Sequence, residues 1–226
     1  MSHPAAPGLR SGVFGIAGRA AGRVAGGLGL LVALAGCSAL GGSTAGDPTP
    51  PAPTSVALEG FDTSSIRVER ADFCDEIPGA SVERALDGKV TGEGHYSSGV
   101  PAEMESDLVD ISHEFGCRFK GPLGAEARAW VFAPPVDAAR AAGLVAELKG
   151  ADGCVPLPPA PAYGNPTVAV ACGTTGQPSI VMAGLFGDAW LTCSLRRASA
   201  SDWDGPRLFD EAGRWCVAVV QAAEGA

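Results

Sequence analysis

The chain has 226 residues, of which 16 are basic and 25 acidic, so its formal net charge is −9. An acidic surface repels phosphate backbones and anionic headgroups, so nucleic acid is excluded as an expected partner. The 32 glycines and the single asparagine, Asn165, are typical of a high-GC genome.

The first segment has the parts of an export signal. Residues 1–23 contain Arg10, Arg19 and Arg23 but no acid, and residues 24–35 are uncharged. A basic region, an apolar run of about 7 to 15 residues and a small-residue exit form a secretory signal. The run is about half the length that a membrane-spanning helix needs. We predict a signal peptide over residues 1–36.

The exit reads LAGC, residues 34–37, and resembles the lipobox of bacterial lipoproteins. The resemblance implies a diacylglyceryl thioether on Cys37, cleavage before it and an acylated (palmitate-type) N-terminus. Two or more acyl chains anchor a protein stably, which predicts a cell-membrane lipoprotein that faces the extracytoplasmic side. Cleavage would change the net charge from −9 to −12, because it removes three arginines and no acid. With the high-GC composition, the lipobox indicates an actinobacterial source. The alternative is an ordinary secretory signal whose cysteine is accidental.

Residues 37–58 form the predicted lipidated cysteine and tether. The segment is rich in Gly, Ser, Thr, Ala and Pro, with too few large apolar groups to offset the entropy of ordering. Whether its threonines carry sugars stays open. Residues 59–226 are long enough for one domain with a single core.

Six cysteines remain after Cys37, and an even number in an exported chain predicts three disulfides among 15 possible connectivities. No two are spaced as Cys-x-x-Cys, so a thioredoxin-like motif and a zinc ribbon both lack their signature. The six are Cys74, Cys117, Cys154, Cys172, Cys193 and Cys216.

The first half of the domain predicts a short helix near residues 81–88, a loop over 87–101 and a strand over 108–120. The strand alternates with a period of two. Its inward positions are Val109, Ile111, His113, Phe115, Cys117 and Phe119. A helical spacing of Met104, Leu108, Ile111 and Phe115 competes, but the alternation lasts longer. Residues 125–133 predict a second strand, and Pro134-Pro135 open a helix over 136–149 that ends at Gly150.

The second half repeats that order. Strands are predicted at 168–172, 179–186 and 189–196, with a hairpin turn at Gly187-Asp188. A closing helix begins near Pro206. The predicted fold class is α+β, an antiparallel sheet with helices packed on it and stapled by disulfides. The repeated order of strands and helix suggests an internal duplication.

These elements indicate how the cysteines pair. Cys193 shares a strand face with leucines, and Cys216 shares the apolar stripe of the closing helix, so the two are predicted to bond. Cys117 points inward from its strand and Cys74 precedes the first helix, which pairs them by the same argument. Cys154 and Cys172 would then staple the proline-rich segment between them.

The stretch FCDEIPGASVERALDG, followed by GCRF at residues 116–119, resembles a family of actinobacterial lipoprotein domains of unknown function. In this chain Phe119 stands where the family has Trp, and the helix carries more charge. The resemblance implies an α+β fold with an antiparallel sheet. It implies no activity.

The sequence contains no Gly-x-Ser-x-Gly, His-x-x-x-His, phosphate loop or complete Gly-x-Gly-x-x-Gly motif. His113 is predicted as a buried core histidine and His95 as a solvated loop residue. A metal role would require either histidine to meet one of three nearby carboxylates. These are Glu103, Glu105 and Asp107. We predict a solvated acidic face instead, with no metal and no cofactor.

Two further groups favour structural roles. Asp72, Asp75 and Glu76 cluster beside Cys74, where they could do acid–base work, but charge at the start of a short helix is the preferred interpretation. The four tryptophans are predicted in the core rather than on a binding platform. They are Trp130, Trp190, Trp203 and Trp215.

Together these features predict a non-enzymatic envelope lipoprotein whose domain binds an apolar small molecule or another envelope protein. One alternative is an envelope hydrolase with an unfamiliar site using His113 or His95, and another is a structural component of an envelope complex. An enclosed apolar cavity would favour the small molecule, and a flat exposed apolar patch would favour the protein partner. Histidine and carboxylates converging in a cleft would favour the hydrolase.

Overall fold

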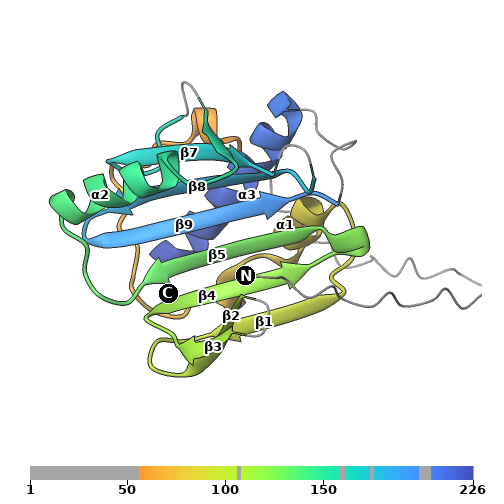
Figure 1. Cartoon of the computed structure of the whole chain (residues 1–226), viewed down its shortest axis with the longest axis horizontal. Coiled ribbons are helices and arrows are strands. Elements are labelled where there is room, and N and C mark those ends of the chain that lie inside the picture. The colour runs from red at the N-terminus through yellow and green to blue at the C-terminus, as the bar shows by residue number, and fades with distance from the viewer. Residues whose placement is uncertain (1–55, 106–107, 158–160, 174–175, 199–204, 226) are drawn as a thin grey trace, which may run out of the picture. The chain divides into compact units, whose positions relative to one another are not determined.

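The computed structural model describes residues 56–105, 108–157, 161–173, 176–198 and 205–225, which form an α+β domain (Figure 1). The predicted signal peptide, Cys37 and most of the tether lie outside these residues, as do Asp107 and Trp203. The helices are α1 (Gly79–Leu86), α2 (Ala138–Lys149) and α3 (Gly205–Glu224), with short 3-10 turns at Leu58–Gly60, Cys74–Glu76 and Pro122–Gly124. The strands are β1 (Gly92–Tyr96), β2 (Pro101–Glu105), β3 (Leu108–Ile111), β4 (Glu114–Lys120), β5 (Glu126–Phe132), β6 (Cys154–Pro156), β7 (Thr167–Cys172), β8 (Ser179–Phe186) and β9 (Ala189–Arg196).

A seven-stranded antiparallel sheet organises the domain, in the order β1-β4-β5-β9-β8-β7-β6. The predicted α+β class is therefore confirmed. At the centre of the sheet, β5 from the first half of the domain pairs with β9 from the second half, with Ala129 opposite Cys193. The remaining strands, β2 and β3, form a separate two-stranded hairpin.

One face of the sheet is covered by α1 and α3, which lie behind it in Figure 1. Every second residue of β5 points to this face and is fully buried, namely Ala127, Ala129 and Val131. Such small side chains let α3 approach the sheet closely. Trp215 of α3 fills the space above Phe119 of β4, with ring centroids 6.0 Å apart. This side holds the main core.

On the opposite face, α2 is the element that packs among the described residues, and it covers only part of the sheet. Pro134 and Pro135 precede this helix, the Asp137 side chain caps it by accepting a hydrogen bond from the Arg140 amide (2.7 Å), and Gly150 ends it. These signals place the helix as predicted, two residues shorter at its start. It buries apolar side chains against β7 and β8, including Leu144. None of the described helices lies on the half of this face formed by β1, β4, β5 and β9 (Figure 1).

Three disulfides staple the domain, and the predicted pairing is confirmed. Cys193 of β9 bonds Cys216 of α3, and Cys74 bonds Cys117 of β4, so two bridges tie the covered face to the elements packed on it. The third joins Cys154 to Cys172. Cys154 belongs to the short edge strand β6 and lies directly opposite Cys172 in the sheet.

The predicted strand over 108–120 is two strands, and its first inward positions are wrong. Val109 is 64% exposed and Ile111 47% exposed, and His113 is exposed rather than buried. The break falls at Ser112, whose hydroxyl donates to the Glu114 carbonyl (2.7 Å) and accepts from the Glu114 amide (3.1 Å). Such local side-chain bonds compete with a continuing sheet ladder. The alternation holds from Phe115 onward.

Three further expectations need correction. The predicted loop over 87–101 contains the edge strand β1, and Leu58 at the end of the predicted tether is already buried in the core. The arrangement of the helices does not support a duplication. A two-fold axis relating antiparallel β5 and β9 would run perpendicular to the sheet and keep both helices on one face, whereas α2 and α3 pack on opposite faces.

Candidate functional site

The uncovered part of the sheet, which we call the open half-face, is built by alternate residues of β1, β4, β5 and β9. Side chains in a strand alternate between faces, so these residues point away from α1 and α3. Most are half-buried by one another, and Lys120 is exposed. They are Tyr96, Glu114, Gly116, Arg118, Lys120, Glu126, Arg128, Trp130, Ser194 and Arg196.

Tyr96 lies across Gly116, its partner in the register of β1 and β4. A Cβ at position 116 would overlap the Tyr96 ring, so only glycine leaves room for it. The phenol donates a hydrogen bond to the Glu114 carboxylate (2.7 Å). Burial, and then the nearby negative charge of Glu114, raises the pKa of Tyr96, so the phenol stays protonated.

Glu114 and Arg128 continue this network toward the centre of the sheet. Burial raises the pKa of the Glu114 carboxyl, against the opposing effects of the Tyr96 hydrogen bond and the Arg128 charge. The Arg128 guanidinium lies 5.3 Å from the centroid of the Trp130 ring, which is within cation–π range. The open half-face therefore carries an aromatic ring and a cation in contact with each other.

Two further arginines flank one carboxylate at the other end of the open half-face. The same Oε2 atom of Glu126 lies 3.3 Å from a terminal nitrogen of Arg196 and 3.8 Å from Nε of Arg118. The Nε–H groups of Arg128 and Arg196 are buried and have no hydrogen-bond partner among the described residues. The basic side chains therefore exceed the acidic ones here, although the chain as a whole is acidic.

The hairpin of β2 and β3 projects beside the open half-face (Figure 1), which it joins through Ser112 and His113. Val109 and Ile111 lie on one face of the hairpin, where both are exposed, and Val100 at its base is 43% exposed. A two-stranded hairpin gains little stability by itself. Exposed apolar side chains on such an element are typical of a contact surface.

His95 lies elsewhere, on the other face of β1 at the edge of an open hollow of about 410 Å³. Its Nε2 is 2.9 Å from Glu93 and its Nδ1 3.5 Å from Asp75, and its ring meets Phe119 edge-on. The Asp75 side chain is 93% exposed. His95 is thus in a strand, not in the predicted loop, and its ion pairs are of the weak, solvated kind.

The hollow brings Asp72, Asp75 and Glu76 together with His95 and Ser97, which is the convergence that would favour a hydrolase. However, Ser97 donates to both oxygens of Asp72 (2.8 Å each), whereas His95 pairs with Asp75 and Glu93. An activated nucleophile needs its base within hydrogen-bond reach. The described contacts do not assemble that relay.

Contrary to the prediction, the acidic residues beside Cys74 do not lie at the start of the short helix α1. Asp75 and Glu76 lie in a 3-10 turn that ends before α1, and the first turn of α1 contains no acid. Among the described residues no group of three His, Cys, Asp or Glu side chains could hold a metal ion. Glu103 and Glu105 belong to β2, but their side chains lie outside the described part.

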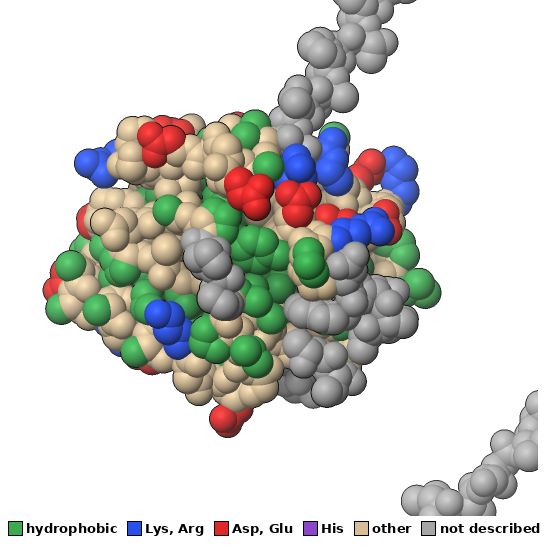
Figure 2. Space-filling model, turned by 90° about the horizontal axis from the view of Figure 1, so that it is seen from above, with side chains coloured by type: hydrophobic (Ala, Val, Ile, Leu, Met, Phe, Trp, Pro, Cys, Tyr) green, Lys and Arg blue, Asp and Glu red, His purple; other side chains and the backbone are tan. Residues whose placement is uncertain are grey.

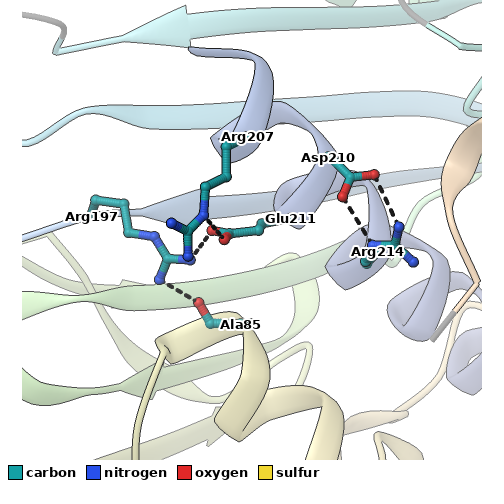
Figure 3. A network of polar contacts seen from close by, with 6 residues as sticks. All are labelled: Ala85, Arg197, Arg207, Asp210, Glu211 and Arg214. Atoms are coloured by element: carbon teal, nitrogen blue, oxygen red, sulfur yellow. Dashed lines mark hydrogen bonds and ion pairs between the residues drawn. The ribbon is translucent and has the colours of Figure 1, made fainter. Parts of the chain in front are cut away.

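A polar cluster between α1 and α3 holds the covered side together (Figure 3). Arg197 is 8% exposed, donates to the Ala85 carbonyl at the end of α1 (2.8 Å) and pairs with Glu211 of α3. Burial opposes ionisation of Glu211, but hydrogen bonds from Arg197 and Arg207 outweigh it and hold the carboxyl pKa below its usual value. The adjacent hollow of about 70 Å³ is far smaller than a small-molecule pocket. This cluster is structural.

Charge is distributed differently elsewhere on the surface. In the view from above, basic side chains stand next to acidic ones, and hydrophobic side chains fill the middle of the face (Figure 2). On α3, Arg214 and Asp210 pair at i,i+4 spacing. Exposed ion pairs of this kind contribute little to folding stability, and they do not indicate a binding site.

The prediction that Trp130 lies in the core is wrong. Trp190 and Trp215 are buried as predicted, but Trp130 is half-buried on the open half-face. The signal was present in β5, where Glu126, Arg128 and Trp130 alternate with small apolar residues. That pattern assigns Trp130 to the polar face of the strand.

Comparisons of the chain with protein-family models and with curated proteins give no match. In the part of the chain that the structure describes, none of the helices has the length and apolar character to cross a bilayer.

Proposed function

We propose that this protein is a non-enzymatic lipoprotein of the cell envelope, held at the membrane by acylated Cys37, whose domain docks a protein partner on the open half-face. The observation that carries the proposal is a sheet face that the described helices leave half uncovered, with Trp130, Tyr96 and arginines on it. These residue types are enriched at the centres of protein interfaces. The exposed apolar hairpin beside it extends the same surface.

The geometry favours a protein partner over an apolar small molecule. The hollow between α1 and α3 is too small for a ligand, and the hollow at His95 is open and acidic. Binding of a small apolar molecule requires enclosure by apolar side chains. The open half-face is broad and mixes aromatic with charged groups, which suits a macromolecular surface.

Anchoring is tested by Cys37→Ala. We expect the variant to leave the membrane fraction and appear in the soluble fraction. Its thermal unfolding curve should be unchanged, because the six cysteines of the domain bond with one another and do not need Cys37. A variant that partitions into detergent like the parent would contradict the lipoprotein assignment.

Docking is tested by photo-cross-linking in the native host. A photoreactive amino acid replaces Lys120 on the open half-face or, as the matched control, Lys149 at the end of α2; both lysines are exposed. We expect a discrete protein adduct from position 120 and none from position 149. Equal adducts from both, or none from position 120, would contradict docking on this face.

A further inference from the structure

The open half-face carries an excess of positive charge on an acidic chain. Its strands bring Arg118, Lys120, Arg128 and Arg196 to one side of the sheet, against the carboxylates of Glu114 and Glu126. The chain has 25 acidic and only 16 basic residues. Four basic side chains on one patch therefore make the local charge opposite to that of the whole molecule.

Two of these guanidinium groups lie beside one carboxylate. Arg118 and Arg196 approach the same oxygen of Glu126, so one carboxylate serves two cations. A guanidinium offers five donors in a fork that matches a carboxylate. Because basic side chains outnumber carboxylates on the open half-face, the patch attracts further carboxylates.

The edge strand leaves this cluster accessible. Gly94 of β1 lies directly opposite Arg118, and no described atom lies within 4 Å of the position where its Cβ would be. The floor beside Arg118 is therefore bare backbone, over which an extended chain can lie. Trp130, beside Arg128, supplies an apolar plane in the same patch.

We propose that the partner docked on the open half-face presents an acidic, extended protein segment, whose carboxylates pair with Arg118, Arg128 and Arg196. This inference rests on the proposed function and specifies the chemistry of its partner. Charge complementarity selects the segment, and the apolar hairpin nearby favours a protein over a purely ionic polymer. The same positive patch would steer an acidic partner toward a domain that otherwise repels it.

The test exchanges the sign of charge at one open position. Gly94→Lys and Gly94→Asp place either charge opposite Arg118 without a steric clash. Gly60→Lys and Gly60→Asp are the matched controls. Within the described part of the chain, Gly60 also has no atom within 4 Å of its Cβ position, and it lies in the 3-10 turn that packs on α3. The full-length lipidated protein in detergent is titrated into fluorescein-labelled poly-L-glutamate, and the anisotropy is measured. Circular dichroism confirms that each variant is folded.

We expect Gly94→Lys to bind more tightly and Gly94→Asp more weakly than the parent, with about a tenfold span between them. The Gly60 variants should bind as the parent does, and added salt should weaken every complex. Three outcomes would overturn the inference: no change at position 94, equal weakening by both Gly94 variants, or stronger binding of a polyuronate or duplex DNA than of poly-L-glutamate. If the Gly94 variants bind like the parent but position 120 still gives a cross-link, docking on the open half-face stands. Only the inference that the partner presents an acidic segment is then wrong.

Discussion

The two faces of β5 differ although one strand builds both. Toward α3 it presents Ala127, Ala129 and Val131, each with 0% exposure, whereas toward the open half-face it presents Glu126, Arg128 and Trp130, which are half-buried. Small apolar groups allow close packing of a helix and contribute stability. Large amphipathic groups without a covering element fit binding instead. The covered face therefore holds the fold together, and the open half-face is the surface available to a partner.

Substituting the two tryptophans on opposite faces gives the largest expected contrast. Trp215 is 1% exposed and its indole donates to the Arg128 carbonyl (3.1 Å), so Trp215→Ala should cost about 3 to 5 kcal/mol of unfolding free energy. Trp130→Ala should cost about 1 kcal/mol or less, because the ring is partly solvated. Urea unfolding under non-reducing conditions measures both. Equal losses would erase the distinction between the faces.

The disulfides sharpen the same comparison. Cys193 and Cys216, both 0% exposed, should together cost about 2 to 5 kcal/mol when changed to Ala. The bridge between half-buried Cys154 and Cys172 closes a loop of similar length, with a sequence separation of 18 against 23. The two bridges should therefore contribute similarly through loop closure. Removing the Cys154–Cys172 bridge should cost less free energy of unfolding, because it leaves no cavity in the core. A larger loss at the Cys154–Cys172 bridge would contradict the assignment of stability to the covered face.

Much of this architecture could be predicted because its signals are local. Proline, an Asp cap and Gly150 bound α2, and the inward alternation of Cys117 and of Cys193 indicated two bridges. The break at Ser112 could not be predicted, since a hydroxyl competing for the backbone of Glu114 leaves the apolar alternation intact on both sides. The open half-face was missed for a different reason: its residues come from four strands whose order depends on long-range pairing. Only Trp130 could have been assigned from its own strand.

Two neighbouring arginines provide the third prediction. Arg197→Met removes a buried cation that joins α1 to α3, and leaves Glu211 without its innermost partner, so we expect a loss of about 3 kcal/mol. Arg196→Gln acts on the open half-face, where it should change stability by about 0.5 kcal/mol and weaken poly-L-glutamate binding instead. Denaturant unfolding and the anisotropy titration separate the two effects. A large loss of stability in Arg196→Gln, or a loss of binding without a loss of stability in Arg197→Met, would contradict these roles.

The Glu211 cluster also predicts a pH dependence. Because its pKa is lower in the folded protein than in the unfolded chain, Glu211 stabilises the fold above the unfolded value, and this contribution is lost as pH falls through the folded value. The parent should therefore lose more unfolding free energy than Glu211→Gln between about pH 7 and about pH 3. Identical losses on acidification would show that the ion pairs with Arg197 and Arg207 contribute nothing.

The smallest effect is expected for the histidines. Both His95 and His113 are exposed, and His95 contacts solvated carboxylates and the edge of the Phe119 ring. The double change to Ala should therefore alter stability by about 0.5 kcal/mol or less. Binding on the open half-face should be unchanged. A folded double variant that loses its biological activity would restore the hydrolase alternative.

Radical footprinting tests the central claim most directly, because it compares the same side chains with and without the envelope. Intact host membranes and the purified full-length protein are exposed to hydroxyl radicals, and oxidation is quantified by mass spectrometry. Leu123, which is 89% exposed and lies outside the open half-face, is the internal reference. The account predicts that Trp130 and Tyr96 are protected in the envelope relative to Leu123. Equal oxidation of Trp130 in both samples would contradict the claim that a partner covers this face.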